Sequence, residues 1–206
     1  MPKVFCIGFH KTGTTSMRVL LEALGYRVQG HHGVRDAAFV ERLRAGDLGE
    51  LLELAREHDA FEDNPWPIFF RELDRHFPGS QFILTVRDPA SWVRSAVDSF
   101  GRQPGPGTVM RELVYGFGSP VGHEDVYRSR FERHQREVRE HFRGREEDLL
   151  VVDLAEPEAL ARICGFLGKP PPFERMPHAN RGPASSRPRW LRRLRELAAG
   201  CRRRSF

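Results

Sequence analysis

The segment from Gly8 to Ser16 (GFHKTGTTS) combines glycines, one lysine and a dense group of hydroxyl side chains. A short apolar run precedes it, and the residues that follow repeat apolar side chains at helical spacing. A strand that turns through glycines into a helix directs several backbone amides, and the positive end of the helix dipole, toward one point. This pattern predicts a phosphate-binding loop. The contacts are expected from His10, Lys11, Thr12, Gly13, Thr14, Thr15 and Ser16.

The position of the lysine separates this loop from the nucleotide triphosphate loop, which reads GxxxxGK[ST]. Lys11 stands two residues before Gly13 rather than directly after the last glycine. The apolar run Gln81 to Val86 (QFILTV) continues directly into Arg87, so the usual carboxylate ligand of magnesium is missing from the end of this strand. A magnesium-dependent kinase is therefore disfavoured. It stays as one alternative, and a noncatalytic nucleotide-binding protein on the same fold is another.

Two motifs in this order resemble the sulfotransferases that use 3′-phosphoadenosine 5′-phosphosulfate (PAPS). GFHKTGTTS resembles their 5′-phosphosulfate loop, and RDPASWVRS places Arg87 at a strand end with Ser95 eight residues later. The resemblance spans roughly residues 3–180. It implies a P-loop nucleotide-kinase-like sulfotransferase fold, PAPS as co-substrate, adenosine 3′,5′-bisphosphate as product and no metal. Arg87 and Ser95 would hold the 3′-phosphate, and Lys11 would neutralise charge on the departing 5′-phosphate.

The resemblance also implies a general base after the next internal strand, where the chain reads AFEDNPWP. Asp63 is the first choice, because similar members carry Asp, one residue and Pro at this turn, and Glu62 is close behind. Neighbouring side chains on a strand point to opposite faces, so only one of the two faces the site. The alternative is that either carboxylate caps the following helix. His10 is a third candidate, better suited to the pocket wall. Arg181, in PHANRGP, is carried over as a phosphate contact, although the basic glycine-rich pattern of the family is absent there.

Strand-like and helical segments alternate along the chain, which predicts an α/β fold with a parallel sheet covered by helices on both faces. The strands are expected at Val4 to Gly8, Gln81 to Val86 and Leu149 to Leu154, with shorter ones at Tyr26 to Val28 and Ala60 to Glu62. The charged segment Asp125 to Phe142 is expected to be a helix that covers the sheet edge. A further helix is expected over Glu156 to Leu167, with Pro157 in its first turn.

We expect a single domain over residues 1–206, with a Pro-rich loop at about 170–188 and a basic helix at about 188–204. That helix carries an apolar stripe, which favours docking on its own domain. Contact with a membrane surface is the alternative. The stretch 104–123 and Pro172 to Phe173 are expected to form walls or lids of the acceptor site.

The composition, with 39% hydrophobic and 30% charged residues, is typical of a soluble globular protein. The sequence begins without a recognisable secretory signal, and its three cysteines fit reduced thiols, so a cytoplasmic location is expected. The net charge of +5 is concentrated near the C-terminus and favours anionic ligands, but no nucleic-acid partner is expected. The motifs suit a small-molecule, carbohydrate or glycopeptide acceptor alike, and they do not specify an oligomeric state.

Overall fold

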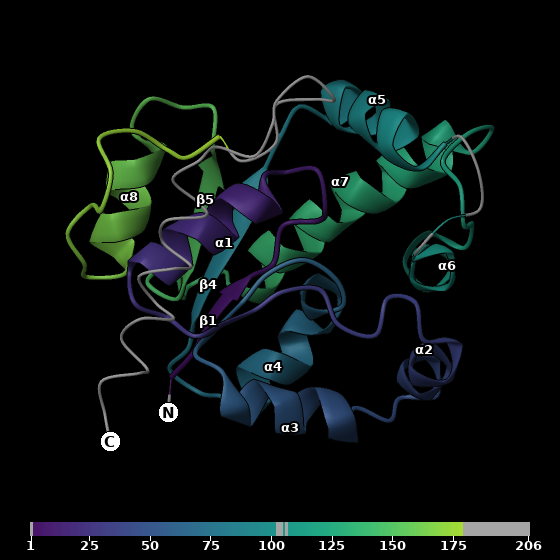
Figure 1. The fold of residues 1–206 in the computed structure, drawn as a ribbon, viewed down its shortest axis with the longest axis horizontal. Helices are drawn as coiled ribbons and strands as arrows, with labels where there is room; N and C mark the ends of the chain where they lie inside the picture. The colour runs from purple at the N-terminus through teal and green to yellow at the C-terminus, as the bar shows by residue number, and fades with distance from the viewer. Residues whose placement is uncertain (1, 102–104, 106, 179–206) are drawn as a thin grey trace, which may run out of the picture.

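The computed structural model describes residues 2–101, 105 and 107–178 (Figure 1). The strands are β1 (Val4–Cys6), β2 (Val28–Gln29), β3 (Ala60–Phe61), β4 (Gln81–Val86) and β5 (Leu149–Asp153). The α-helices are α1 (Thr14–Ala23), α2 (Ala37–Arg44), α3 (Gly49–Glu57), α4 (Phe70–His76), α5 (Pro89–Phe100), α6 (Thr108–Tyr115), α7 (Glu124–His141) and α8 (Ala159–Phe166). A short 3₁₀ helix, η1 (Trp66–Phe69), leads into α4.

In the described part of the chain the five strands form one sheet in the order β2-β3-β1-β4-β5, and every pair is parallel. β1 lies at the centre, where Val4 pairs with Ala60 of β3 and with Gln81 of β4. The predicted α/β class with a parallel sheet is confirmed. Because parallel strands end at the same edge, the loops that follow β1, β3, β4 and β5 meet there.

Alternation along β1 divides the apolar interior between the two faces of the sheet. Val4 and Cys6 belong to the core that α1 and α8 close. Phe5 and Ile7 belong to the larger core, to which α2 to α7 contribute. Figure 1 shows α1 and α8 on one side of the central strands, with α3, α4 and α7 on the other. Helices therefore cover both faces, as predicted.

Helix α7 covers a face of the sheet, so the expectation that it covers the edge is wrong. Tyr127, Phe131 and Val138 form a buried stripe on one side of α7, which contacts α5 and the internal strand β4. His134 lies in the same stripe and donates from Nε2 to the Ile7 carbonyl at 2.6 Å. A few aromatic and apolar side chains at helical spacing thus bury one side of a helix whose other side is charged.

Two further helices differ from the sequence-based expectation. α8 begins at Ala159, and Pro157 lies in the turn before the helix rather than in its first turn. The stretch 104–123 contains α6, which begins after Gly107 and ends before Gly116. Both glycines have positive φ, a conformation that favours glycine and that here delimits the helix.

The C-terminal part of the chain lies largely outside the described residues. The expected basic helix at about 188–204 and Arg181 fall there, and the expected Pro-rich loop is described only to residue 178. Within the described ranges, no helix is long and apolar enough to cross a bilayer.

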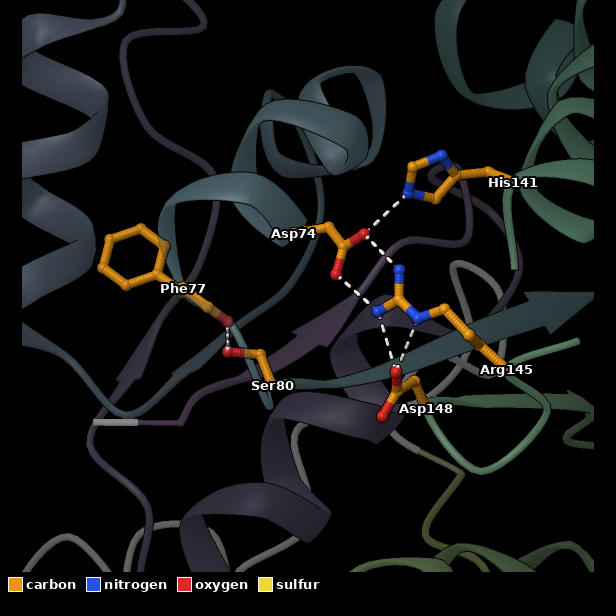
Figure 2. Close-up of polar contacts among 6 residues, drawn as sticks. All are labelled: Asp74, Phe77, Ser80, His141, Arg145 and Asp148. Atoms are coloured by element: carbon orange, nitrogen blue, oxygen red, sulfur yellow. Dashed lines mark hydrogen bonds and ion pairs between the residues drawn. The ribbon is translucent and has the colours of Figure 1, made fainter. Parts of the chain in front are cut away.

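A polar network joins α4, α7 and the start of β5 at the amino edge of the sheet (Figure 2). Asp74 accepts two hydrogen bonds from the Arg145 guanidinium, both at 2.8 Å, and one from His141 Nε2 at 2.8 Å. Arg145 also donates to Asp148, directly before β5. The hydrogen bonds from Arg145, followed by that from His141, lower the pKa of Asp74. The ionised carboxylate therefore stabilises the fold.

Asp74→Ala is expected to lower the free energy of unfolding by about 2 kcal/mol, because it leaves the Arg145 guanidinium and the His141 Nε2–H without their shared acceptor. Denaturant unfolding at pH 7 measures this loss. Since the folded-state pKa of Asp74 is lowered, the stabilisation is fully present above the ordinary value of 3.8 and is lost as the pH falls through the folded value. The matched control is Glu53→Ala, which removes an exposed ion pair with Arg56 and is expected to cost less than about 0.5 kcal/mol. Equal losses in the two variants would contradict the prediction.

Candidate active site

A cavity of about 650 Å³ opens at the carboxyl edge of the sheet. Its walls come from the segments that follow β1, β3, β4 and β5, and from residues 176–178. The volume lies within the range of sites that hold small molecules and cofactors, about 300–1,000 Å³. The loop after β1, the end of β4 and the turn after β3 are far apart in the sequence, but their residues line one cavity.

The loop after β1 lies against β4 at a distance that only glycine allows. A Cβ atom at Gly8 would lie 1.9 Å from Thr85 Oγ1 and 2.5 Å from the Thr85 carbonyl oxygen. Thr12 Oγ1 donates to the Phe9 carbonyl at 2.6 Å, which leaves it to accept from Thr85 Oγ1, also at 2.6 Å. The Thr12 hydroxyl, expected to contact phosphate, therefore holds the loop in shape, although Thr12 does line the cavity.

The amino end of α1 opens into the cavity together with two cationic side chains. α1 begins at Thr14 directly after Gly13, whose φ of 101° is left-handed. The first amides of a helix have no partner within it and attract anions. Lys11 also has a left-handed φ of 68°, which is uncommon for a residue with a side chain. Burial, and then the neighbouring Arg87 guanidinium, lower the pKa of Lys11.

Asp63 lines the same cavity from the segment after β3. Its backbone is left-handed, with a φ of 66°. Asp63 Oδ2 accepts a hydrogen bond from Thr14 Oγ1 at 3.2 Å. Its Oδ1 accepts one from the backbone N–H of Asn64 at 2.7 Å. These bonds hold the carboxylate at the cavity wall beside the start of α1.

Glu62 is not among the described residues that line the cavity, and its carboxylate lies on the α1 side of the sheet beside Arg18. It is 4% exposed, and burial, followed by the nearby Asp63 charge, raises the pKa of its carboxyl to about 8. The Arg18 Nε atom lies 3.6 Å from Glu62 Oε1, too far for a hydrogen bond, and this contact does not offset burial. The raised pKa favours the neutral form of Glu62, and its position outside the cavity wall leaves it away from a bound acceptor.

His10 forms a wall between the loop and the larger core. Its ring stacks on Trp92 with the centroids 5.8 Å apart and meets Phe100 edge-on. Asn64 Nδ2 can only donate, so His10 Nδ1 accepts at 3.4 Å and Nε2 carries the hydrogen that reaches Tyr115 Oη at 3.2 Å. Burial lowers the pKa of His10 to about 4. A neutral ring with both nitrogens engaged serves as a wall rather than as a base.

Comparison with known proteins identifies the family. A family model described as a sulfotransferase domain matches residues 3–185, most of the chain. This chain belongs to the sulfotransferase family. A relative from Aspergillus versicolor, the Ava biosynthesis cluster protein M, is 30% identical over 109 residues. The aligned region covers 45% of this chain and 41% of that protein, so the match spans about two-fifths of the length of the relative.

The 3′-phosphate contacts implied by the sulfotransferase resemblance are only partly assembled at the cavity. Arg87 lines it and donates from Nη1 to the Lys11 carbonyl at 3.1 Å. Ser95 is half-buried on α5 and is not among the described residues that line the cavity, whereas Ser91, one turn earlier, is. Arg181 lies outside the described residues, but His178 of the same segment reaches the cavity wall.

Ser91 was not predicted from the sequence, although the helical period indicates it. Residues four apart lie on the same face of a helix, and the helix start lies nearest the strand end that carries Arg87. Within the described ranges of this sulfotransferase-family protein, no group of three or more His, Cys, Asp or Glu residues is arranged to hold a metal ion. Metal independence stays a prediction.

Gly8→Ala is expected to lower the free energy of unfolding by about 2 kcal/mol or more, because the added Cβ collides with the backbone of β4. Thermal or denaturant unfolding measures the change. The matched control is Gly165→Ala in α8, where a Cβ meets nothing within 4 Å. That variant is expected to keep or slightly raise stability, since alanine favours a helix by up to about 1 kcal/mol over glycine. A neutral Gly8→Ala variant would mean that the loop does not require the close contact with Thr85.

Proposed function

We propose that this protein transfers a sulfuryl group from PAPS to a hydroxyl or amine of an acceptor. The observation that supports it is the convergence on one cavity of the amino end of α1, Lys11, Arg87 and Asp63. Membership of the sulfotransferase family supports the same reaction class. The acceptor is proposed to be a small molecule or a carbohydrate group.

The residues present fit a doubly phosphorylated nucleotide. The first amides of α1 and the Lys11 ammonium form one anion site, and the Arg87 guanidinium, from the strand next to β1, provides a second cation on the same cavity. When bound, PAPS supplies the sulfuryl group, with adenosine 3′,5′-bisphosphate as its leaving group. Lys11 then neutralises charge on the 5′-phosphate side, and Arg87 orients the 3′ side. Positioning and charge stabilisation are the main contributions that such a transfer needs from the protein.

Asp63 provides the base in this proposal, because it is the carboxylate that reaches the cavity from the turn after β3. The acceptor oxygen gives its proton to Asp63 and forms a bond to sulfur. The bond between sulfur and the 5′-phosphate oxygen breaks in the same step and releases the bisphosphate. Thr14 and the Asn64 amide hold both carboxylate oxygens, so the base keeps a fixed orientation.

Adenosine 3′,5′-bisphosphate is expected to bind without magnesium, as measured by isothermal titration calorimetry. Lys11→Ala and Arg87→Ala are each expected to weaken binding by at least about tenfold, because each removes a charged contact to phosphate. The control is Arg143→Ala, an exposed arginine paired with Glu140 at the end of α7. If the protein bound ATP with magnesium but did not bind the bisphosphate, the result would instead support a kinase.

Asp63→Asn is expected to lower kcat by about 100-fold or more, since it removes the proton acceptor while it keeps the side-chain shape. Turnover is measured with labelled PAPS and a panel of phenol, alcohol, amine and carbohydrate acceptors. Glu62→Gln is the matched comparison, and we expect it to keep turnover within about tenfold because Glu62 does not line the cavity and its raised pKa favours the neutral form. Equal activity in the two variants, or a larger loss in Glu62→Gln, would remove the assignment of Asp63.

A further inference from the structure

The end of β5 forms one wall of the cavity. Asp153, Leu154 and Ala155 line it there. Asp153 is the register partner of Val86, the residue directly before Arg87. Because neighbouring parallel strands lie about 4.8 Å apart, Asp153 ends the strand beside the one from which Arg87 emerges. A carboxylate and a guanidinium therefore line the same cavity from adjacent strand ends.

Leu154 links this wall to the start of α1. A Cβ atom at Gly13 would lie 2.5 Å from Leu154 Cδ1, so the leucine side chain fills the space beside the glycine. Leu154 also packs against the core that α1 and α8 close, to which Met176 belongs. Met176 and Pro177 line the cavity as well. The end of β5 thus lies against the anion site at the amino end of α1, with apolar surface next to it.

The turn after β5 fixes one oxygen of the Asp153 carboxylate. Oδ1 accepts a hydrogen bond from the backbone N–H of Ala155 at 2.9 Å, and the Asp153 carbonyl accepts one from the Glu156 N–H at 3.1 Å. Such a local bond holds an aspartate side chain in one orientation. Within the described ranges, Oδ2 has no hydrogen-bond or ion-pair partner. It is therefore the oxygen that a ligand in the cavity can bind.

Asp153 differs from the other carboxylates that line the described part of the cavity. Asp88 caps α5, because its Oδ1 accepts a hydrogen bond from the Ser91 backbone N–H at 2.8 Å, and Asp63 is the proposed base. A carboxylate repels the anionic groups that the cations of this cavity attract. Asp153 therefore favours a neutral hydrogen-bond donor at its end of the cavity and disfavours a further negative charge.

The ribose of the proposed nucleotide carries such a donor in the matching position. Its 5′-phosphate is proposed to lie at the loop after β1 and its 3′-phosphate at Arg87, after β4. On the ribose ring, carbon 3′ lies between carbon 2′ and the carbon that carries the 5′ group. The strand order β1-β4-β5 thus follows the order 5′, 3′, 2′ around the sugar, and it brings the 2′-hydroxyl to Asp153.

We propose that Asp153 accepts a hydrogen bond from the ribose 2′-hydroxyl and makes the site selective for nucleotides with a phosphate at 3′ and a free hydroxyl at 2′. The carboxylate would repel a phosphate placed at 2′. The acidic residue of dinucleotide-binding folds recognises the ribose 2′-hydroxyl by the same chemistry. This assignment rests on the proposed function, because that function identifies the nucleotide.

Calorimetric titration with three nucleotides tests the selectivity. They are adenosine 3′,5′-bisphosphate, its 2′-deoxy analogue and adenosine 2′,5′-bisphosphate. The first is expected to bind at least about fivefold more tightly than the 2′-deoxy analogue, which lacks the hydrogen bond. It is expected to bind about 100-fold more tightly than the 2′,5′ isomer, which puts a phosphate at Asp153 and none at Arg87. Equal affinities of the first two nucleotides would overturn the proposal.

Three variants assign the selectivity to its residue. Asp153→Ala removes the acceptor and is expected to bring the ratio of ribose to 2′-deoxyribose affinity close to one. Asp153→Asn keeps an acceptor oxygen and the side-chain shape but removes the charge, so it is expected to narrow the discrimination against the 2′,5′ isomer several-fold. Glu156→Gln removes an exposed charge paired with Arg162 and should leave both ratios unchanged. If Asp153→Ala does not fold, Asp153→Asn decides, and unchanged discrimination in it would overturn the proposal.

The adenine amino group is the other neutral donor on the same nucleotide. Inosine 3′,5′-bisphosphate carries an oxo group in place of this amine and keeps the 2′-hydroxyl. We expect its affinity to change by the same factor in Asp153→Ala as that of the adenosine bisphosphate. If instead only the adenosine bisphosphate lost affinity in Asp153→Ala, the carboxylate would bind the base, and the proposal would be overturned.

The outcome is separable from that of the proposed function. Ribose selectivity that depends on Asp153, without sulfuryl transfer to any acceptor, would contradict the proposed function and support the selectivity. Sulfuryl transfer together with equal affinities for the ribose and 2′-deoxyribose nucleotides would overturn the selectivity alone. If none of the three nucleotides bound at millimolar concentration, both proposals would be overturned.

Discussion

The contact between Gly8 and Thr85 is the constraint on which the site depends. Because Gly8 has no side chain, the loop after β1 lies directly against the end of β4, and the hydroxyls of Thr12 and Thr85 fix it there. This contact brings the Lys11 carbonyl within hydrogen-bonding distance of Arg87. The cations of Lys11 and Arg87, which follow different strands, therefore line one cavity before any ligand binds. Their mutual repulsion contributes to the lowered pKa of Lys11, and a bound phosphate would relieve it.

The turn after β3 divides two neighbouring carboxylates between different environments. Asp63 enters the cavity through a left-handed backbone conformation, and Glu62 is buried beside Arg18 on the side of α1. The left-handed turn at Asp63 thus separates a carboxylate that lines the cavity from one that is buried on the α1 side of the sheet. Left-handed conformations at Lys11 and Asp63 are unfavourable for residues with side chains, and both occur at the cavity. This coincidence fits a site that the surrounding packing holds in position.

The parts that could be predicted from sequence are those that local pattern determines. β4, α1 and the loop between β1 and α1 follow from apolar periodicity and glycine spacing, and the turn with Asp63 follows from its proline-containing motif. The parts that were missed depend on contacts between distant segments. α7 reads as an exposed charged helix until Tyr127 and Phe131 are seen against α5. Helical spacing relates Ser91 to Ser95, but which of the two lines the cavity becomes clear only when α5 is placed beside the loop.

The network around Asp74 has a consequence for how this molecule can change. It joins α4 and the end of α7 to the residues that directly precede β5, while the cavity forms where the strands finish. Structural reinforcement and chemistry therefore occupy opposite ends of the same strands. The loops at the carboxyl edge can therefore change in length and composition without altering the contacts of Asp74 at the other end.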